Sequence, residues 1–135
     1  MDRRELLVEV RRTRNDCVFG LRLTLDAGRS ERGIAFAESY DYLPLGSDPG
    51  REYIYSVYTE YAALVPLTEF LETLLGESFE GEPADRLVAC FHALVAAGEL
   101  GDGLPLQENH RKVAAWCEQA GIAAETETWT WINSD

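Results

Sequence analysis

The spacing of apolar residues changes about halfway along this chain, and that change limits the folds it can adopt. Up to about residue 61, apolar side chains alternate with polar ones, as in Leu6, Val8 and Val10, which is the period of strands with one buried face. From Pro66 onward they recur every third or fourth residue, as in amphipathic helices. The spacing therefore predicts strands followed by helices.

Four strands are predicted before the change of period. A polar stretch at 13–16 separates the first two strands, which favours a hairpin. Pro49 and Gly50 predict a type II turn before the fourth strand, because proline presets φ at the first central position and glycine accepts the positive φ of the second. The predicted strands are 6–10, 19–25, 34–45 and 52–61.

Three helices are predicted, each opened by a proline. Proline suits the first turn of a helix because its missing N–H would have no intrahelical partner there. Gly121 is placed to end the third helix in a left-handed conformation. The expected apolar stripes are Leu67, Phe70, Leu71, Leu74 and Leu75 after Pro66; Leu87, Val88, Phe91, Leu94 and Val95 after Pro83; and Leu106, Val113, Trp116, Cys117 and Ala120 after Pro105.

Alternation returns at 125–132, which predicts a closing strand whose Trp129 and Trp131 are expected to seal the core. Strands, then helices, then one strand indicate an α+β fold with a mainly antiparallel sheet of about five strands and two or three helices packed on one face. A length of 135 residues suits a single globular domain over 1–135. The absence of regular β-α alternation argues against doubly wound nucleotide-binding folds.

Acidic residues are concentrated in the second part of the chain. Residues 1–51 hold nine acidic and nine basic side chains, so residues 52–135 carry the whole net charge of −12. Between Glu52 and Asp85 there are eight acidic residues and no Lys, Arg or His. This excess argues against nucleic acids and anionic membranes as partners, since phosphate binding needs a cationic face. A cationic partner is expected instead.

No apolar run of signal-peptide or membrane-span length occurs in the sequence, so a cytoplasmic location is expected. Cys17, Cys90 and Cys117 are far apart and form no Cys-x-x-Cys pair, so neither a disulfide framework nor a metal centre is expected, and no cofactor is predicted. Buried, structural thiols are the ordinary outcome, although a Cys–His nucleophile pair involving His92 or His110 stays open.

Tyrosines and carboxylates alternate over 40–60 and form the predicted partner-binding set. Tyrosine supplies contact area with few rotatable bonds, and a neighbouring carboxylate can bind an Arg or Lys of a partner. In the alternative interpretation, about half of these rings are buried beneath the helices, as is common in strands. The set is Tyr40, Asp41, Tyr42, Asp48, Glu52, Tyr53, Tyr55, Tyr58 and Glu60.

A secondary acidic loop leads into the second predicted helix and consists of Glu77, Glu80, Glu82 and Asp85. Carboxylates at a helix start gain from the helix dipole, which explains part of the cluster. The loop lacks the regular Asp-x-Asp-x-Asp-Gly pattern of a calcium site, so no metal is predicted there.

Three functions fit these features. The first is a non-catalytic acidic protein that neutralises a basic partner. In size, charge and expected cytoplasmic location the chain resembles bacterial immunity proteins that block toxins, above all nucleases; the resemblance is one of composition and covers no motif. The second is a small-ligand-binding or enzymatic α+β domain with a Tyr/Trp-lined pocket. The third is a scaffold or subunit whose acidity maintains solubility. Oligomeric state is left open.

Overall fold

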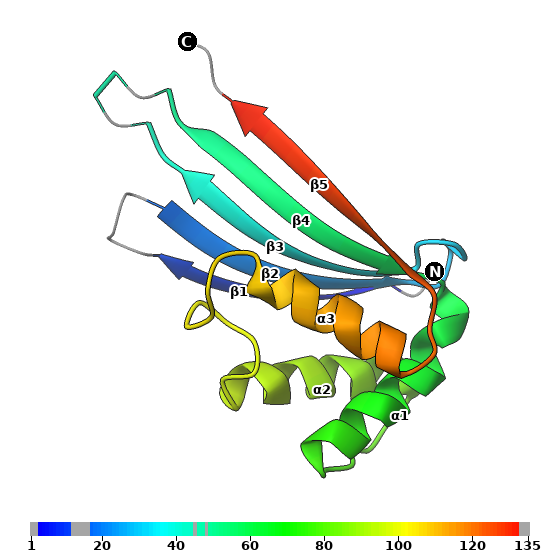
Figure 1. The fold of residues 1–135 in the computed structure, drawn as a ribbon. Helices are drawn as coiled ribbons and strands as arrows, with labels where there is room; N and C mark the ends of the chain where they lie inside the picture. Colours follow the sequence, from blue (N-terminus) through cyan, green and yellow to red (C-terminus); the bar gives the residue numbers. More distant parts are fainter. Residues whose placement is uncertain (1–2, 12–16, 45, 48, 133–135) are drawn as a thin grey trace.

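Five strands form one antiparallel sheet whose strand order follows the sequence (Figure 1). The computed structural model describes residues 3–11, 17–44, 46–47 and 49–132. The predicted polar turn at 13–16 therefore lies outside the described residues. The strands are β1 (Arg3–Arg11), β2 (Cys17–Asp26), β3 (Ile34–Tyr42), β4 (Arg51–Thr59) and β5 (Ala124–Ile132).

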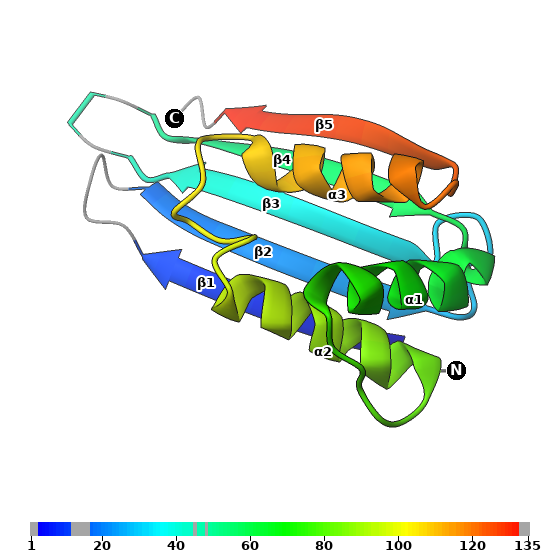
Figure 2. The ribbon, with the colours of Figure 1, turned by 60° about the horizontal axis from the view of Figure 1, so that its bottom comes forward.

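The helices cover one face of this sheet, which confirms the predicted α+β arrangement (Figure 2). They are α1 (Leu64–Leu75), preceded by the 3-10 turn η2 (Tyr61–Ala63), α2 (Pro83–Ala96) and α3 (Glu108–Gln119). The α1 and α2 helices pack on each other, α2 also contacts β1 and β2, and α3 contacts β3, β4 and β5. No described helix lies on the other face of the sheet, called the open face below.

Side chains alternate between the two faces of the sheet, and those on the helix side form part of the core. The odd-numbered residues of β2 are directly opposite the even-numbered residues of β3, so the two sets share one face of the sheet. This face points toward the helices, since its residues belong to the buried core. The Phe36 ring of β3 contacts the Phe91 ring of α2, with centroids 5.5 Å apart. Each fully buried side chain of this size contributes about 1.5–3 kcal/mol. Buried members include Phe19, Leu21, Leu23, Leu25, Ile34, Leu67, Leu71, Leu87 and Leu94.

The helix boundaries differ from the prediction at two of the three prolines. Pro83 begins α2 as expected, but α1 begins two residues before Pro66 and α3 begins three residues after Pro105. Gln107 adopts a left-handed φ of 68°, which keeps the preceding residues out of the helix. The expected positive φ is found at Gly50 and Gly121.

Two leucines assigned to apolar stripes are exposed, so the predicted stripes were wrong there. Leu74 is 47% exposed, and the buried face of α1 instead includes Thr68 and Glu72. Leu106 is 56% exposed because it lies in the irregular segment before α3. Packing of α1 on its neighbours decided the first case, and the late start of α3 decided the second.

The two tryptophans of β5 lie on the open face, so the expectation that they seal the core was wrong. Trp129 and Trp131 are 46% and 47% exposed. They pair with Ile54 and Glu52 of β4, which also point away from the helices. The threonines of β5 occupy the helix-facing positions instead. The tryptophans therefore belong to a surface, not to the interior.

Glu72 links α1 to the segment that leads into α2. Its side chain is only 10% exposed and receives a 2.5 Å ion-pair contact from Nη2 of Arg86. The backbone N–H of Phe79 donates to the same carboxylate at 2.9 Å. The hydrogen bonds from Arg86 and Phe79 lower the pKa of Glu72 below its ordinary value of 4.5.

This lowered pKa gives a pH-dependent contribution to stability. A carboxylate with a depressed folded-state pKa stabilises the fold fully above the unfolded pKa and loses that contribution as pH falls through the folded pKa. The Glu72→Gln variant is therefore expected to be less stable than wild type at pH 7 and to approach it below the ordinary value of 4.5. Urea unfolding at several pH values checks this, with exposed Glu118→Gln on α3 as the control. A stability difference that stays constant with pH would contradict the expectation.

Candidate functional site

The strand register separates the predicted partner-binding residues onto two faces of the sheet. Adjacent residues of a strand point to opposite sides. Four of the tyrosines (Tyr40, Tyr42, Tyr53 and Tyr55) therefore face the helix side, whereas Asp41, Glu52 and Tyr58 face the open side. Glu60 is exposed beyond the end of β4, and Asp48 lies outside the described residues. The structure does not bring the set together on one surface.

Asp41 and Glu52 form a like-charge pair on the open face. They are directly opposite each other in the β3–β4 register, an arrangement that destabilises a sheet. Partial burial raises the pKa of Glu52, the negative charge of Asp41 raises it further, and Arg22 acts in the opposite direction. Within the described ranges, neither carboxylate forms an ion pair. The nearest cation that acts on the pair is thus Arg22, which forms its own ion pair with Glu5.

Exposed indole rings adjoin this carboxylate pair. Trp131 is opposite Glu52, and Trp129 is opposite the half-buried Ile54. An indole face attracts an Arg or Lys cation, and a carboxylate binds the same group through charge-assisted hydrogen bonds. We refer to Asp41, Glu52, Ile54, Trp129 and Trp131 as the acidic-aromatic patch. Its chemistry suits basic side chains of another protein.

Arg32 offsets part of the negative charge at the other end of the open face. Its Nε donates to Glu125 at 2.7 Å, its Nη2 lies 3.1 Å from Glu127, and its guanidinium carbon lies 4.2 Å from the centre of the Tyr58 ring. The chain thus binds one of its own arginines with two carboxylates and an aromatic ring. The acidic-aromatic patch presents the same kinds of group without such an arginine in the described structure.

The helix face carries a buried polar network centred on Glu38. This side chain is fully buried, and its carboxylate lies 2.5 Å from Nδ1 of His110. The His110 backbone N–H and the Tyr40 hydroxyl also donate to it, both at 2.8 Å. Gln107 N–H donates in turn to the Tyr40 oxygen at 3.0 Å, and the Tyr55 ring stacks on the imidazole with centroids 5.1 Å apart. Four side chains and two backbone amides are joined in this way.

This network caps α3. The helix has no capping hydrogen bond from the side chain of its own N-cap residue, Gln107. The first amides of a helix have no intrahelical acceptor and need one from elsewhere. Glu38 and Tyr40 of β3 supply acceptors to two of them. Glu38 is not among the residues predicted from the sequence, although its position in line with Ile34 and Phe36 places it on the helix side.

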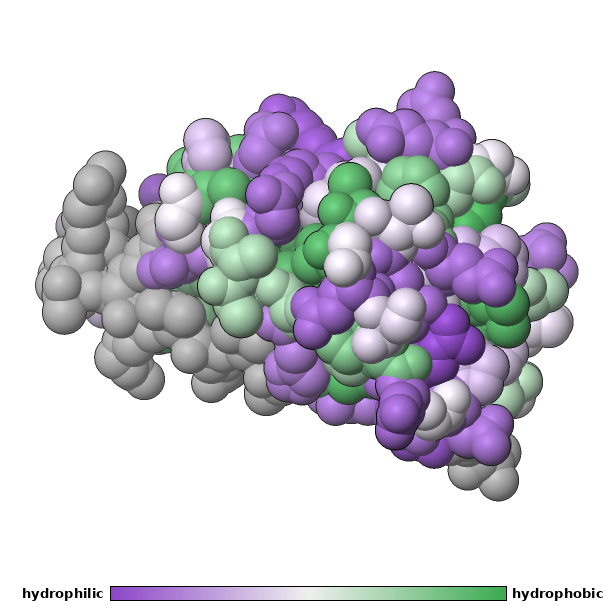
Figure 3. All heavy atoms as spheres, turned by 90° about the horizontal axis from the view of Figure 1, so that it is seen from below, coloured by the Kyte–Doolittle hydropathy of each residue, from purple (hydrophilic) through white to green (hydrophobic). Residues whose placement is uncertain are grey.

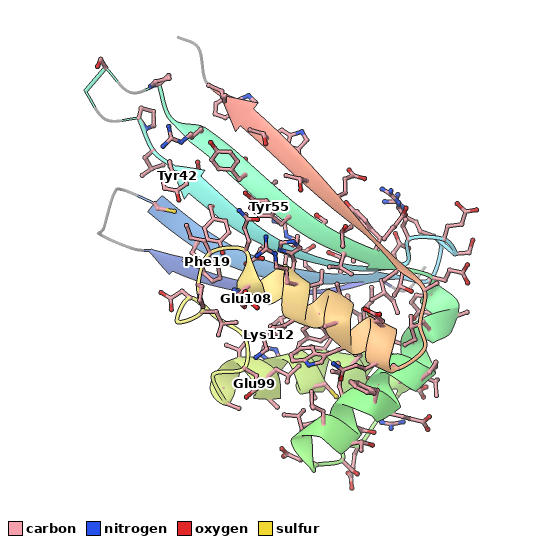
Figure 4. The ribbon with its side chains drawn as sticks, in the orientation of Figure 1. Phe19, Tyr42, Tyr55, Glu99, Glu108 and Lys112 are labelled. Atoms are coloured by element: carbon pink, nitrogen blue, oxygen red, sulfur yellow. The ribbon has the colours of Figure 1, made fainter. Side chains whose placement is uncertain are left out.

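A small cavity lies beside this network, where the sheet extends beyond the first turn of α3. Figure 4 shows Tyr55 near the start of α3 and Tyr42 farther toward the end of the sheet. The cavity has a volume of about 250 Å³. Trp129 and Trp131 lie on the opposite face and do not line it, in contrast to the Tyr/Trp pocket considered from the sequence. Its lining residues are Tyr40, Tyr42, Arg51, Tyr53, Tyr55, Leu106 and Gln107.

The secondary acidic loop is only partly neutralised. Asp85 forms an ion pair with Arg4 of β1. Glu77 lines a shallow depression between α1 and α2 together with Glu69 and Arg86. Glu80 and Glu82 are exposed. Over the described ranges, no three His, Cys, Asp or Glu side chains are grouped so that they could hold a metal ion.

All three cysteines are buried. Burial raises the pKa of Cys90 and of Cys117 to about 11, so both thiols are protonated at neutral pH. The protonated thiol is not the nucleophilic form. His92 is exposed on α2. These positions fit the structural interpretation of Cys90 and Cys117.

Seen from the helix side, hydrophobic residues occur in small groups separated by hydrophilic ones (Figure 3). None of the described helices has the length and apolar character needed to cross a membrane. Comparisons with protein-family models, with curated proteins and with solved structures gave no match for this chain.

Proposed function

We propose that this chain is a non-catalytic acidic protein that binds and neutralises a basic protein, and that the basic protein docks on the acidic-aromatic patch. The observation that carries the proposal is the opposed pair Asp41 and Glu52 beside two half-exposed indole rings. Like charges facing each other weaken the sheet. A bound cation would offset that repulsion, so binding of a basic partner would stabilise the Asp41–Glu52 pair.

The overall charge supports the same choice of partner. A net charge of −12 steers cationic proteins toward the chain and can raise association rates to about 10⁸ M⁻¹s⁻¹ at low salt. Tryptophan is among the residues that dominate binding energy at protein interfaces. A sheet face without a helix cover offers a broad surface, whereas small molecules are bound in concave sites.

In its most specific form, the proposal is that of a cytoplasmic immunity protein that blocks a toxin such as a nuclease. A nuclease binds phosphates through cationic groups. The carboxylates of Asp41 and Glu52 would occupy those groups and exclude the nucleic acid. The size and acidity of the chain support this form of the proposal.

Affinity capture from the source cells at low salt, followed by washes up to about 0.5 M salt, tests the proposal, since screening at that ionic strength acts over a few Å. Wild type is compared with the Asp41→Asn/Glu52→Gln double variant. The matched control is Glu69→Gln/Glu118→Gln, which removes two exposed charges from the helices.

A basic protein held by wild type and by the control, but released from the Asp41→Asn/Glu52→Gln variant at lower salt, is the expected result. The proposal is wrong if no basic protein is captured. It is also wrong if both double variants release the protein at the same salt concentration, because the effect would then reflect net charge alone.

A further inference from the structure

The aromatic walls of the tyrosine-lined cavity on the helix face are held by contacts with neighbouring side chains. The buried Glu38–His110 network positions two of its rings, because the Tyr40 hydroxyl donates to Glu38 and the Tyr55 ring stacks on His110. The Tyr42 and Tyr53 rings meet edge to face with centroids 6.2 Å apart. Aromatic walls held by their neighbours form a site before any ligand arrives, which lowers the entropy lost on binding.

Arg51 is the cation of this cavity. Its guanidinium carbon lies 5.3 Å from the centre of the Tyr42 ring. Among the described residues no carboxylate pairs with Arg51, although the chain has 24 acidic residues and most arginines that line the sheet are paired. Its neighbour Glu52 points to the open face. An arginine without a carboxylate beside aromatic rings is suited to an anion that also carries an apolar surface.

We propose that this cavity binds a small aromatic carboxylate, with its ring between the tyrosines and its carboxylate on Arg51. The volume of about 250 Å³ is slightly below that of typical drug-sized sites, so it accommodates a ligand with a single ring. Offset or edge-to-face contacts with Tyr42, Tyr53 and Tyr55 hold the ring, and the planar guanidinium matches a carboxylate through two parallel hydrogen bonds. This site is separate from the acidic-aromatic patch.

Titration of the full chain with benzoate and with benzamide, followed by amide NMR, tests the site. The two probes have nearly the same shape and differ in charge. Benzoate is expected to bind saturably with a Kd of about 1 mM or below and at least about tenfold more tightly than benzamide. The resulting shifts are expected at Tyr53, Tyr55 and Gln107, which line the cavity.

The Arg51→Gln variant is expected to bind benzoate no more tightly than benzamide, whereas Arg29→Gln keeps the wild-type preference. Both arginines are exposed, so folding is retained, and only Arg51 lines the cavity. No saturation by benzoate, equal affinity for benzamide in the wild type, or shifts confined to another region would each overturn the proposal. None of these measurements uses a protein partner, so their outcome is independent of the proposed function.

Discussion

Replacing Glu38 by alanine is expected to lower the free energy of unfolding by about 3 kcal/mol or more. The change removes an acceptor for the His110 backbone N–H, the His110 ring and the Tyr40 hydroxyl at once. It also leaves a void beneath α3, because Glu38 is fully buried in the described structure. Buried polar groups without partners and partly collapsed voids both destabilise a fold.

Glu38→Gln is expected to have a smaller effect, since the amide keeps the volume and one acceptor oxygen. The matched control is Glu118→Ala on the exposed side of α3, where a change within about 0.5 kcal/mol is expected. Urea unfolding with thermal melts measures all three. If Glu38→Ala were as stable as Glu118→Ala, the network would not hold α3 on the sheet.

Replacing Trp131 by alanine is expected to weaken binding of the basic partner about 30-fold, which corresponds to a hot-spot loss of about 2 kcal/mol. The indole lies beside Glu52 and would cover the partner's cation at the carboxylate pair. Stability should change little, because the side chain is about half exposed. Binding is measured by calorimetry with the captured partner.

Leu74→Ala serves as the control, since Leu74 is equally exposed but lies on α1, on the helix side. Its affinity is expected to equal that of wild type. An unchanged affinity for Trp131→Ala would place the interface elsewhere, and an equal loss in both variants would indicate a general effect of apolar surface.

The sheet and the order of its elements could be predicted from the sequence because they depend on local patterns. Alternation defined the strands, and Pro83 and Gly121 marked a helix start and a helix end correctly. The third helix was placed too early at Pro105, since the left-handed Gln107 and the cap from β3 decide where α3 begins. That cap comes from a residue 72 positions away.

The candidate surface was less predictable because it depends on strand register. Alternation within β4 separates Glu52 from Tyr53, so a stricter use of that rule would have divided the tyrosines between two faces. The opposition of Asp41 and Glu52, and the position of Trp131 beside them, follow from pairings between strands that are distant in sequence. The spacing of residues within one segment does not contain this information.

Indole NMR would show whether a basic protein binds at the acidic-aromatic patch. The chain has three tryptophans, and Trp116 is buried beneath the sheet on α3, where it serves as an internal control. Titration with the captured partner is predicted to shift or broaden the indole N–H signals of Trp129 and Trp131 while that of Trp116 stays in place. Unchanged signals from both β5 tryptophans at saturation would show that the partner does not bind at this patch.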